Sequence, residues 1–158
     1  MSSFRKEYDG LADAIVTRST SGRLLPTGRK NAIVMDAANA VDGRQIPPYY
    51  YTDIAAWDTG AQFSFISPRI VEGLGLKSCG KGQYMGIGGD QESDIFKVHI
   101  GLSNGEIVRD LKVFCTDLDD YDVLLSMDVI KRTDFLITNA EGKTTFQFRT
   151  PSEGGVEL

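Results

Sequence analysis

The sequence contains few of the residues on which many enzyme sites depend. It has one histidine, His99, and two cysteines, Cys79 and Cys115. A single histidine excludes a His-rich zinc site, and only His99 is left for a Ser-His-Asp or Cys-His arrangement. His99 lies in a segment that we interpret as a strand, and we interpret the two cysteines as buried reduced thiols because they are too few and too far apart for a disulfide framework. Any chemistry is therefore expected from carboxylates, hydroxyl groups or backbone atoms, with no metal and no cofactor.

Excess positive charge and long apolar runs are also missing. Lys and Arg number 17 against 22 Asp and Glu, which gives a formal net charge of -5. This is the wrong sign for a surface that follows phosphates, so we expect no nucleic acid partner. No stretch approaches membrane-spanning length, and the first residues lack the apolar run of a signal peptide. We therefore expect a soluble, cytoplasmic protein with no membrane association.

The chain is long enough for one domain and no more. Its 158 residues, 41% hydrophobic and 25% charged, match ordinary globular usage and suffice for one hydrophobic core. We assign residues 1–158 to a single domain without internal repeats or linkers. Within it, residues 1–30 form an N-terminal segment of uncertain structure, and residues 151–158 are expected to form a loose tail.

Apolar residues recur mostly with a period of two, which predicts an all-β barrel or sandwich with little helix. Strands are expected over residues 31–36, 49–57, 63–67, 83–85, 95–100, 107–108, 111–115, 123–125, 135–138 and 144–148. Short helices are expected over residues 68–72 and 128–132.

Turn residues place the hairpins. An Asp-Gly pair within residues 41–44 favours a tight turn, and a glycine-rich tip at 86–89 closes a long hairpin. The N-terminal stretch allows two interpretations. Residues 11–16 have apolar residues at helical spacing, whereas residues 14–18 read as a strand that enters a turn, and we favour the strand.

The most informative motif is Asp58-Thr59-Gly60-Ala61. The apolar segment 54–57 precedes it, and extended sequence resumes after it. A carboxylate at the end of a buried strand is costly unless it is hydrogen-bonded or paired, so such an aspartate differs from one in an ordinary polar turn. The flanks therefore distinguish Asp58 as a candidate functional residue.

This motif resembles the active-site signature of the aspartic proteases, and more closely that of their retropepsin-like (retroviral-type) branch. Two further segments follow in the family's order. Residues 85–89, continued by 95–98, resemble the glycine-tipped flap hairpin, and residues 123–130 resemble the late apolar segment with its short helix. The resemblance covers residues 49–137 and implies a closed or partly closed acid-protease β-barrel.

The resemblance also implies an activity, an aspartic endopeptidase with a polypeptide substrate. Two neighbouring carboxylates would share one proton, and the ionised member would activate water. Since the chain has one Asp-Thr-Gly, the second aspartate is expected from an identical subunit of a homodimer. The implied catalytic residues are Asp58, Thr59, which braces the dyad, and Gly60, which lets the backbone approach it. The implied substrate-binding residues are Ala61, Gly86, Ile87, Gly88 and Gly89.

Two departures from the family pattern support a different class of function. Ser126 stands where the family usually has glycine, and Trp57 replaces an aliphatic residue. The alternative hypothesis is thus a catalytically inactive retropepsin-like module for binding or dimerisation. The acidic residues 90–94 are interpreted as a solvated loop, with selection of basic substrates as the alternative.

Other motifs fail on their spacing. Residues 86–91 do not complete GxGxxG, so no nucleotide cradle is predicted. Residues 117–122 lack the glycine and the glutamate of a calcium loop and are interpreted as a solvated acidic loop.

Overall fold

The computed structural model describes residues 2–12, 15–17, 33–37, 49–52 and 54–154. In this part of the chain strands dominate and both helices are short, so the expected all-β fold is confirmed. The strands are β1 Ser2–Glu7, β2 Ile15–Thr17, β3 Ile33–Asp36, β4 Tyr49–Tyr51, β5 Ala55–Trp57, β6 Phe65–Ile66, β7 Gly80–Gly86, β8 Gly89–Gly101, β9 Ile107–Cys115, β10 Val123–Leu125, β11 Asp134–Ala140 and β12 Lys143–Thr150. The helices are α1 Pro68–Leu74 and α2 Met127–Ile130.

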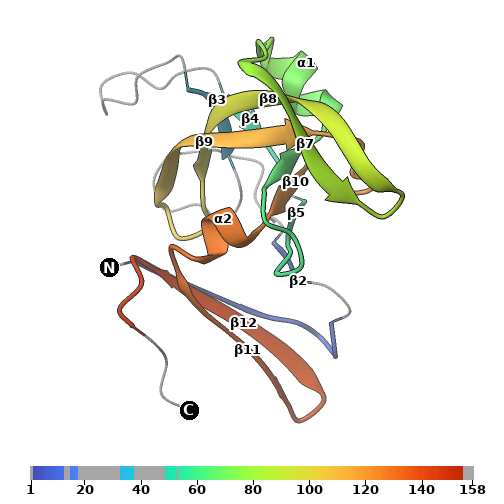
Figure 1. Cartoon of the computed structure of the whole chain (residues 1–158). Coiled ribbons are helices and arrows are strands. Elements are labelled where there is room, and N and C mark those ends of the chain that lie inside the picture. The colour runs from blue at the N-terminus through green and yellow to red at the C-terminus, as the bar shows by residue number, and fades with distance from the viewer. Residues whose placement is uncertain (1, 13–14, 18–32, 38–48, 53, 155–158) are drawn as a thin grey trace.

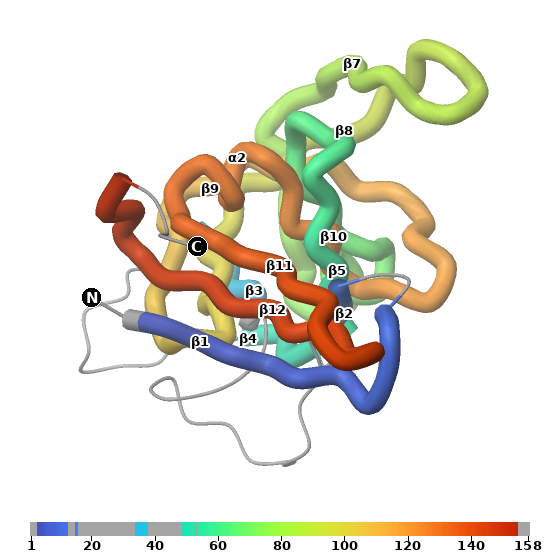
Figure 2. The backbone as a smooth tube through the Cα atoms, turned by 90° about the horizontal axis from the view of Figure 1, so that it is seen from below, coloured from blue at the N-terminus to red at the C-terminus, as the bar shows by residue number. Residues whose placement is uncertain are grey.

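The strands form two sheets (Figure 1). The larger sheet has the order β2-β5-β10-β6-β9-β8-β3-β4, with β7 paired to β8, and it curls into a partly closed barrel. The smaller sheet has the order β1-β12-β11 and is antiparallel throughout. Seen from below, this second sheet lies across one side of the barrel, while the β7–β8 hairpin projects from the far side (Figure 2).

Aromatic side chains join the two sheets. The ring of Trp57 at the end of β5 lies 5.2 Å from that of Phe146 and 4.9 Å from that of Phe148, both on β12. All three residues are buried. Phe146 and Phe148 share the inner side of β12 because side chains alternate along a strand. Burial of these large rings contributes strongly to the stability of the core.

Helix α1 shows why its ends could be predicted from sequence. Ser67 is extended and Pro68 occupies the first turn, where a missing N–H costs nothing. The helix ends at Gly75, whose φ of 61° is left-handed and suits glycine. We expected the helix to end at residue 72. It continues to Leu74, so Gly73 lies inside the helix and Gly75 is the glycine that ends it.

The expected single strand over residues 49–57 is wrong. It is two strands, since β4 pairs with β3 whereas β5 pairs with β2 and β10. The chain changes partners around Thr52, whose hydroxyl donates to Asp122 at 2.9 Å and accepts from the N–H of Ile54 at 3.1 Å. A buried side chain from a distant segment thus breaks a strand that local propensity favours.

Strand β9 joins what we expected to be two strands, 107–108 and 111–115. Its pairing with β8 shifts register between Val98 and Ile100, and Asp110 has a positive φ of 53°. The N–H of Asp110 donates to Nδ1 of His99 at 3.0 Å. His99 is therefore a buried structural residue that satisfies a backbone group at this irregularity.

The N-terminal region differs in part from the expectation. Residues 15–17 form the favoured strand, but β1 was not predicted because its sequence is polar. β1 pairs along its length with β12, from Ser2 opposite Thr150 to Glu7 opposite Thr145. Predictions on residues 18–32 and the turn at 41–44 lie outside the described residues.

No helix in the described part of the chain is both long and apolar enough to cross a membrane.

Candidate active site

Asp58 lies directly after β5, at the end of a parallel pair of strands. β5 runs alongside β10 with Trp57 opposite Leu125, and all three β5 residues are buried. Asp58 extends this pairing by one residue, because its N–H donates to the carbonyl of Leu125 at 2.8 Å. The residue itself is half-buried. The strand pair therefore holds Asp58 at the point where the buried sheet reaches the surface.

The chain then turns back onto the Asp58 carboxylate. The N–H of Gly60 donates to Oδ1 of Asp58 at 2.7 Å, which closes an Asx turn. A Cβ on Gly60 would lie 3.1 Å from the same oxygen, so glycine permits this approach. Thr59 is exposed, and bracing of a dyad by Thr59 stays a prediction.

Two segments that are distant in sequence form what we call the floor of the site, residues 58–64 and 125–128. Backbone hydrogen bonds join them beyond Asp58. The N–H of Met127 donates to the carbonyl of Ala61 at 3.0 Å, and that of Asp128 donates to Gln62 at 3.2 Å. The Asp58 turn is thereby fixed to the start of α2.

Asp128 fastens the floor a second time through its side chain. Its carboxylate accepts hydrogen bonds from the N–H of Ser64 at 2.9 Å and from the Ser64 hydroxyl at 2.6 Å. The Ser64 oxygen accepts in turn from the N–H of Ser126 at 3.1 Å. Hydrogen bonds to a charged group are the stronger kind, so this network adds stability to the segment that carries Asp58.

Asp58 opens into a cavity of about 360 Å³, which we call the Asp58 pocket. Its described lining is Asp58, Gly60, Ala61, Phe65, Tyr84, Met85, Gly86, Ile87, Thr116, Leu118 and Leu124. The structure thus brings five of the predicted site residues to one pocket, and it does not place Thr59, Gly88 or Gly89 in that lining.

Alternation along the strands could have identified some of the residues that the sequence analysis missed. In β10, Val123 and Leu125 are buried whereas Leu124 is half-buried, so Leu124 must face the other way, toward the pocket. Thr116 and Leu118 follow β9 in a loop, and no sequence signal indicated them.

The β7–β8 hairpin carries the predicted glycine-rich tip, and we call residues 85–90 the hairpin tip. Met85 is 81% exposed and Ile87 is fully exposed. Gly89 has a φ of 107°, which side-chain-bearing residues rarely adopt. Residues 90–94 were expected to form a solvated loop; they are largely exposed, but they are a strand and not a loop, because they pair with β7 as part of β8.

A second cavity of about 500 Å³ adjoins the first, and we call it the Asp90 pocket. Its described lining is Gly60, Ala61, Gln62, Phe63, Phe65, Gln83, Tyr84, Met85 and Asp90. Five of these residues, from Gly60 to Met85, also line the Asp58 pocket. The two cavities therefore form one continuous groove between the floor and the hairpin.

Asp122 was expected in a solvated acidic loop, and this is wrong. It is buried, accepts hydrogen bonds from Thr52 at 2.9 Å and Ser67 at 3.0 Å, and pairs with Arg69 at 2.8 Å. Asp122 precedes β10 while Asp58 follows the parallel β5, so the two residues lie at opposite ends of the strand pair, roughly 13 Å apart along the strands. Asp122 is a structural residue of the barrel.

Metal-ligating residues do not gather in the described part of the chain, where no group of three or more His, Cys, Asp or Glu could hold an ion. Both cysteines are free there. Burial, with the negative charges of Asp94 and Glu72, raises the pKa of the Cys115 thiol, which suits an unreactive residue. Cys79 is exposed, so its expected burial is wrong.

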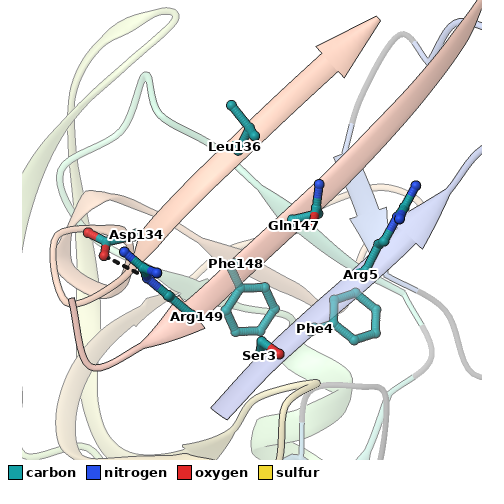
Figure 3. Close-up of a pocket in the computed structure, with 8 residues that line it drawn as sticks. All are labelled: Ser3, Phe4, Arg5, Asp134, Leu136, Gln147, Phe148 and Arg149. Atoms are coloured by element: carbon teal, nitrogen blue, oxygen red, sulfur yellow. Dashed lines mark hydrogen bonds and ion pairs between the residues drawn. The ribbon is translucent and has the colours of Figure 1, made fainter. Parts of the chain in front are cut away.

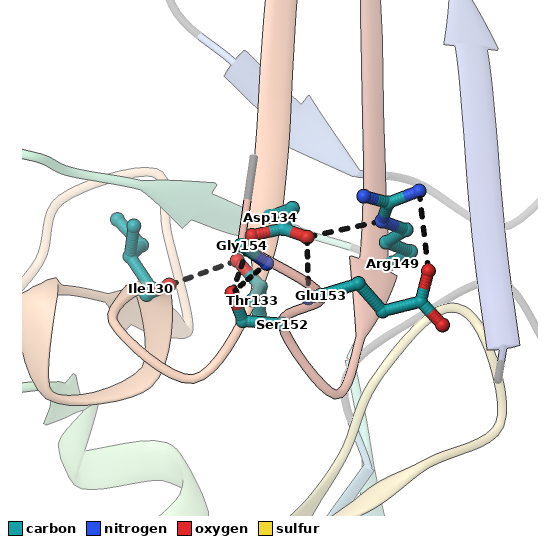
Figure 4. A network of polar contacts seen from close by, with 7 residues as sticks. All are labelled: Ile130, Thr133, Asp134, Arg149, Ser152, Glu153 and Gly154. Carbon is teal, nitrogen blue, oxygen red and sulfur yellow. Dashed lines mark hydrogen bonds and ion pairs between the residues drawn. The ribbon is translucent and has the colours of Figure 1, made fainter. Parts of the chain in front are cut away.

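A third cavity, of about 230 Å³, is lined by residues of β1, β11 and β12 in the smaller sheet (Figure 3). Its charged residues are occupied locally, since Arg149 Nε donates to Asp134 at 3.0 Å. Hydrogen bonds from Ser152 and from the N–H of Glu153, with Arg149 nearby, lower the pKa of Asp134 to about 2 (Figure 4). The expected loose tail is therefore anchored as far as Glu153, and residues 155–158 lie outside the described part.

Neither departure from the family pattern enters the groove. Trp57 packs toward β12, and Ser126 is completely buried within the floor. Within the described residues, Nε1 of Trp57 and Oγ of Ser126 have no hydrogen-bond partner. The Asp58 turn keeps its backbone bonds beside both residues.

The comparison with protein families agrees with the resemblance in sequence. Residues 55–129 match the family described as aspartyl protease. Among solved structures, a retropepsin-like aspartic protease from Rickettsia conorii is similar, with a TM-score of 0.43 and 17% identity over 92% of this chain and 93% of that chain. No curated protein matches the chain in sequence.

Proposed function

Because residues 55–129 match the aspartyl protease family, we propose that the chain is a retropepsin-like aspartic endopeptidase whose catalytic dyad forms across a homodimer. The observation that carries the proposal is the position of Asp58. It supplies the one carboxylate among the described residues of a largely apolar pocket, held by a fastened floor and faced by a glycine-tipped hairpin.

The reaction needs two carboxylates at hydrogen-bond distance, which cannot both be ionised. One accepts a proton from the attacking water while the other donates a proton toward the scissile carbonyl. The apparent pKa values then belong to the pair. Asp58 of each subunit would supply one member, and the hairpin tips would close over the peptide as flaps and exclude water.

The other carboxylates near the site support a second subunit as the source of the partner. Asp128 is engaged with Ser64, and Asp122 is buried at the far end of β10. A twofold axis beside Asp58 would bring in an identical aspartate without any change in either chain. Within this proposal Thr59 braces the dyad from one subunit to the other, and Gly88 and Gly89 allow the tip to approach the substrate.

The inactive module remains the second candidate, and the unpartnered Oγ of Ser126 favours it. A buried hydroxyl without a partner is a cost that a selected catalytic floor would be expected to avoid. Against it stands the intact hydrogen bonding of the Asp58 turn.

Mixing subunits separates the two candidates. The purified protein and Asp58→Asn are assayed on denatured proteins and a peptide library from acidic to neutral pH, and then co-refolded in varying ratios. If the dyad spans two subunits, activity falls with the square of the native fraction, to about one quarter at equal mixing. A linear fall of activity with the native fraction would contradict the shared dyad. A native protein that is dimeric but cleaves no more peptide than Asp58→Asn would favour the inactive module.

A further inference from the structure

The Asp90 pocket has a chemical character that the Asp58 pocket lacks. Both cavities share an apolar wall, but the Asp90 pocket adds the side-chain amides of Gln62 and Gln83 and one carboxylate. Its described lining contains no lysine, arginine or histidine. The larger cavity is therefore open to a ligand group that is both bulky and polar.

The Asp90 carboxylate is not neutralised by the protein. In the described part of the chain its side chain makes no hydrogen bond or ion pair, whereas Glu92, two residues along the same strand, lies 3.8 Å from Lys81. Asp90 stands opposite Met85 in the β7–β8 pairing, at the base of the hairpin tip. The protein thus leaves a negative charge at the rim of the pocket.

Aromatic rings form the wall beside this charge, and they are held in place before any ligand arrives. The ring of Tyr84 packs edge-on against Phe65 at 4.9 Å and lies 5.0 Å from Phe114. Phe63 packs edge-on against Phe114 at 5.6 Å yet is 43% exposed. A wall that is already ordered costs little entropy on binding, and an exposed ring face beside a carboxylate suits a cation.

We infer that the Asp90 pocket selects a basic side chain, arginine before lysine, in the polypeptide that the Asp58 site cleaves. This inference rests on the proposed function. The guanidinium group pairs with Asp90, donates to the amide oxygens of Gln62 or Gln83, and stacks on the exposed ring of Phe63. Arginine fits better than lysine because its planar group has five donors and stacks on aromatic rings.

The position of the basic residue follows from the continuity of the two cavities. A peptide in extended conformation places alternate side chains on one face, so a residue in the Asp58 pocket and the residue in the Asp90 pocket are neighbours or next neighbours in the substrate. The protein's net charge of -5 also attracts cationic peptides before they dock.

The test uses peptide pairs that differ at one position, arginine against its neutral isostere citrulline, scanned over four residues on each side of the cleaved bond. We expect one position on each side of the symmetric site at which arginine raises kcat/KM about tenfold. In Asp90→Asn this arginine-to-citrulline ratio falls toward one. The matched control Glu92→Gln removes one charge from the same strand and keeps the ratio, because Glu92 does not line the pocket.

Binding gives a readout that does not depend on catalysis. The same peptides are titrated against Asp58→Asn and Asp58→Asn/Asp90→Asn by fluorescence anisotropy, with arginine expected to bind about tenfold more tightly than citrulline only in the first protein. The inference would be overturned if arginine peptides bound both proteins with the same affinity. It would also be overturned if Glu92→Gln, made in the Asp58→Asn protein, reduced the arginine preference as much as Asp90→Asn does. Absence of cleavage with a retained arginine preference in binding would instead refute the proposed function alone.

Discussion

The floor of the site and the hairpin tip face the same pocket but are held in different ways. The floor is tied by backbone bonds from Asp58, Met127 and Asp128 and by the two bonds between Ser64 and the Asp128 carboxylate. Among the described residues, only the β7–β8 pairing holds the tip, and its residues Met85 and Ile87 are exposed. Segments with few buried contacts open at low free-energy cost, so the floor and the hairpin tip should differ in stability as well as in exposure.

This difference matches what each wall must do in the proposed reaction. A catalytic carboxylate needs a fixed position, because misplacement by about 1 Å can cost a hundredfold in rate. A segment that admits and covers a peptide needs to move. Loss of a hydrogen bond in the floor is therefore expected to lower stability, and truncation of an exposed side chain in the tip to lower activity alone.

The largest effect is expected for Asp128→Ala in the floor. Both hydrogen bonds to Ser64 are lost, and the free energy of unfolding should fall by about 2–3 kcal/mol. Urea denaturation measures the change. Asp120→Ala, an exposed aspartate in the neighbouring loop, is the matched control and should stay within about 0.5 kcal/mol. Equal stability of the two variants would show that the floor is not held by Asp128.

Ile87→Ala tests the tip in the opposite way. Its side chain is fully exposed, so its removal should change the unfolding free energy by less than about 0.5 kcal/mol. Loss of its contact with a bound peptide should lower kcat/KM about tenfold, a cost close to that of one lost apolar contact. Ile137→Ala, at an exposed position on β11, should change neither quantity. A marked loss of stability in Ile87→Ala would break the contrast between the two walls.

Gly89→Ala and Gly88→Ala form a pair within the tip. Gly89 has a φ of 107°, whereas a Cβ on Gly88 would meet only Gln91 Nε2 at 3.9 Å. Alanine at 89 should therefore strain the backbone by about 1 kcal/mol and speed hydrogen exchange in β7 and β8, while alanine at 88 should not. The same exchange rates in both variants would mean that the tip relaxes without strain.

The smallest effect expected is a gain. Oγ of Ser126 is buried without a partner, so Ser126→Ala should raise the free energy of unfolding by up to about 1 kcal/mol and the melting temperature by about 2–4 °C. Ser64→Ala, whose hydroxyl is engaged on both sides, should lower both. A destabilised Ser126→Ala would indicate that the hydroxyl has a role in the floor.

Much of the fold was predictable because its signals are local. The Asp58 motif, the glycine-rich tip and the start of α1 each depend on residues adjacent in sequence, and each lies where it was expected. Errors occurred where distant partners decide. The predicted strand 49–57 is interrupted at Thr52, whose hydroxyl donates to Asp122. The polar β1 forms a strand because its backbone pairs with β12.

The same division applies to the site. Asp58, Gly60, Ala61, Gly86 and Ile87 were predicted from two motifs, and they do line one pocket. Thr116, Leu118 and Leu124 come from segments more than fifty residues after Asp58, and no local pattern marks them as its neighbours.

The sequence by itself determined the resemblance to the aspartic proteases, because it has one Asp-Thr-Gly and a glycine-rich segment in the order of that family. Only the tertiary structure decided which carboxylates are held by other side chains and which one faces a pocket. Asp122 and Asp128 carry the same carboxylate as Asp58. Asp122, however, is paired with Arg69, and Asp128 accepts a hydrogen bond from Ser64. The physical reason is that the role of a carboxylate depends on the donors packed around it, and those donors come from segments that only folding brings together.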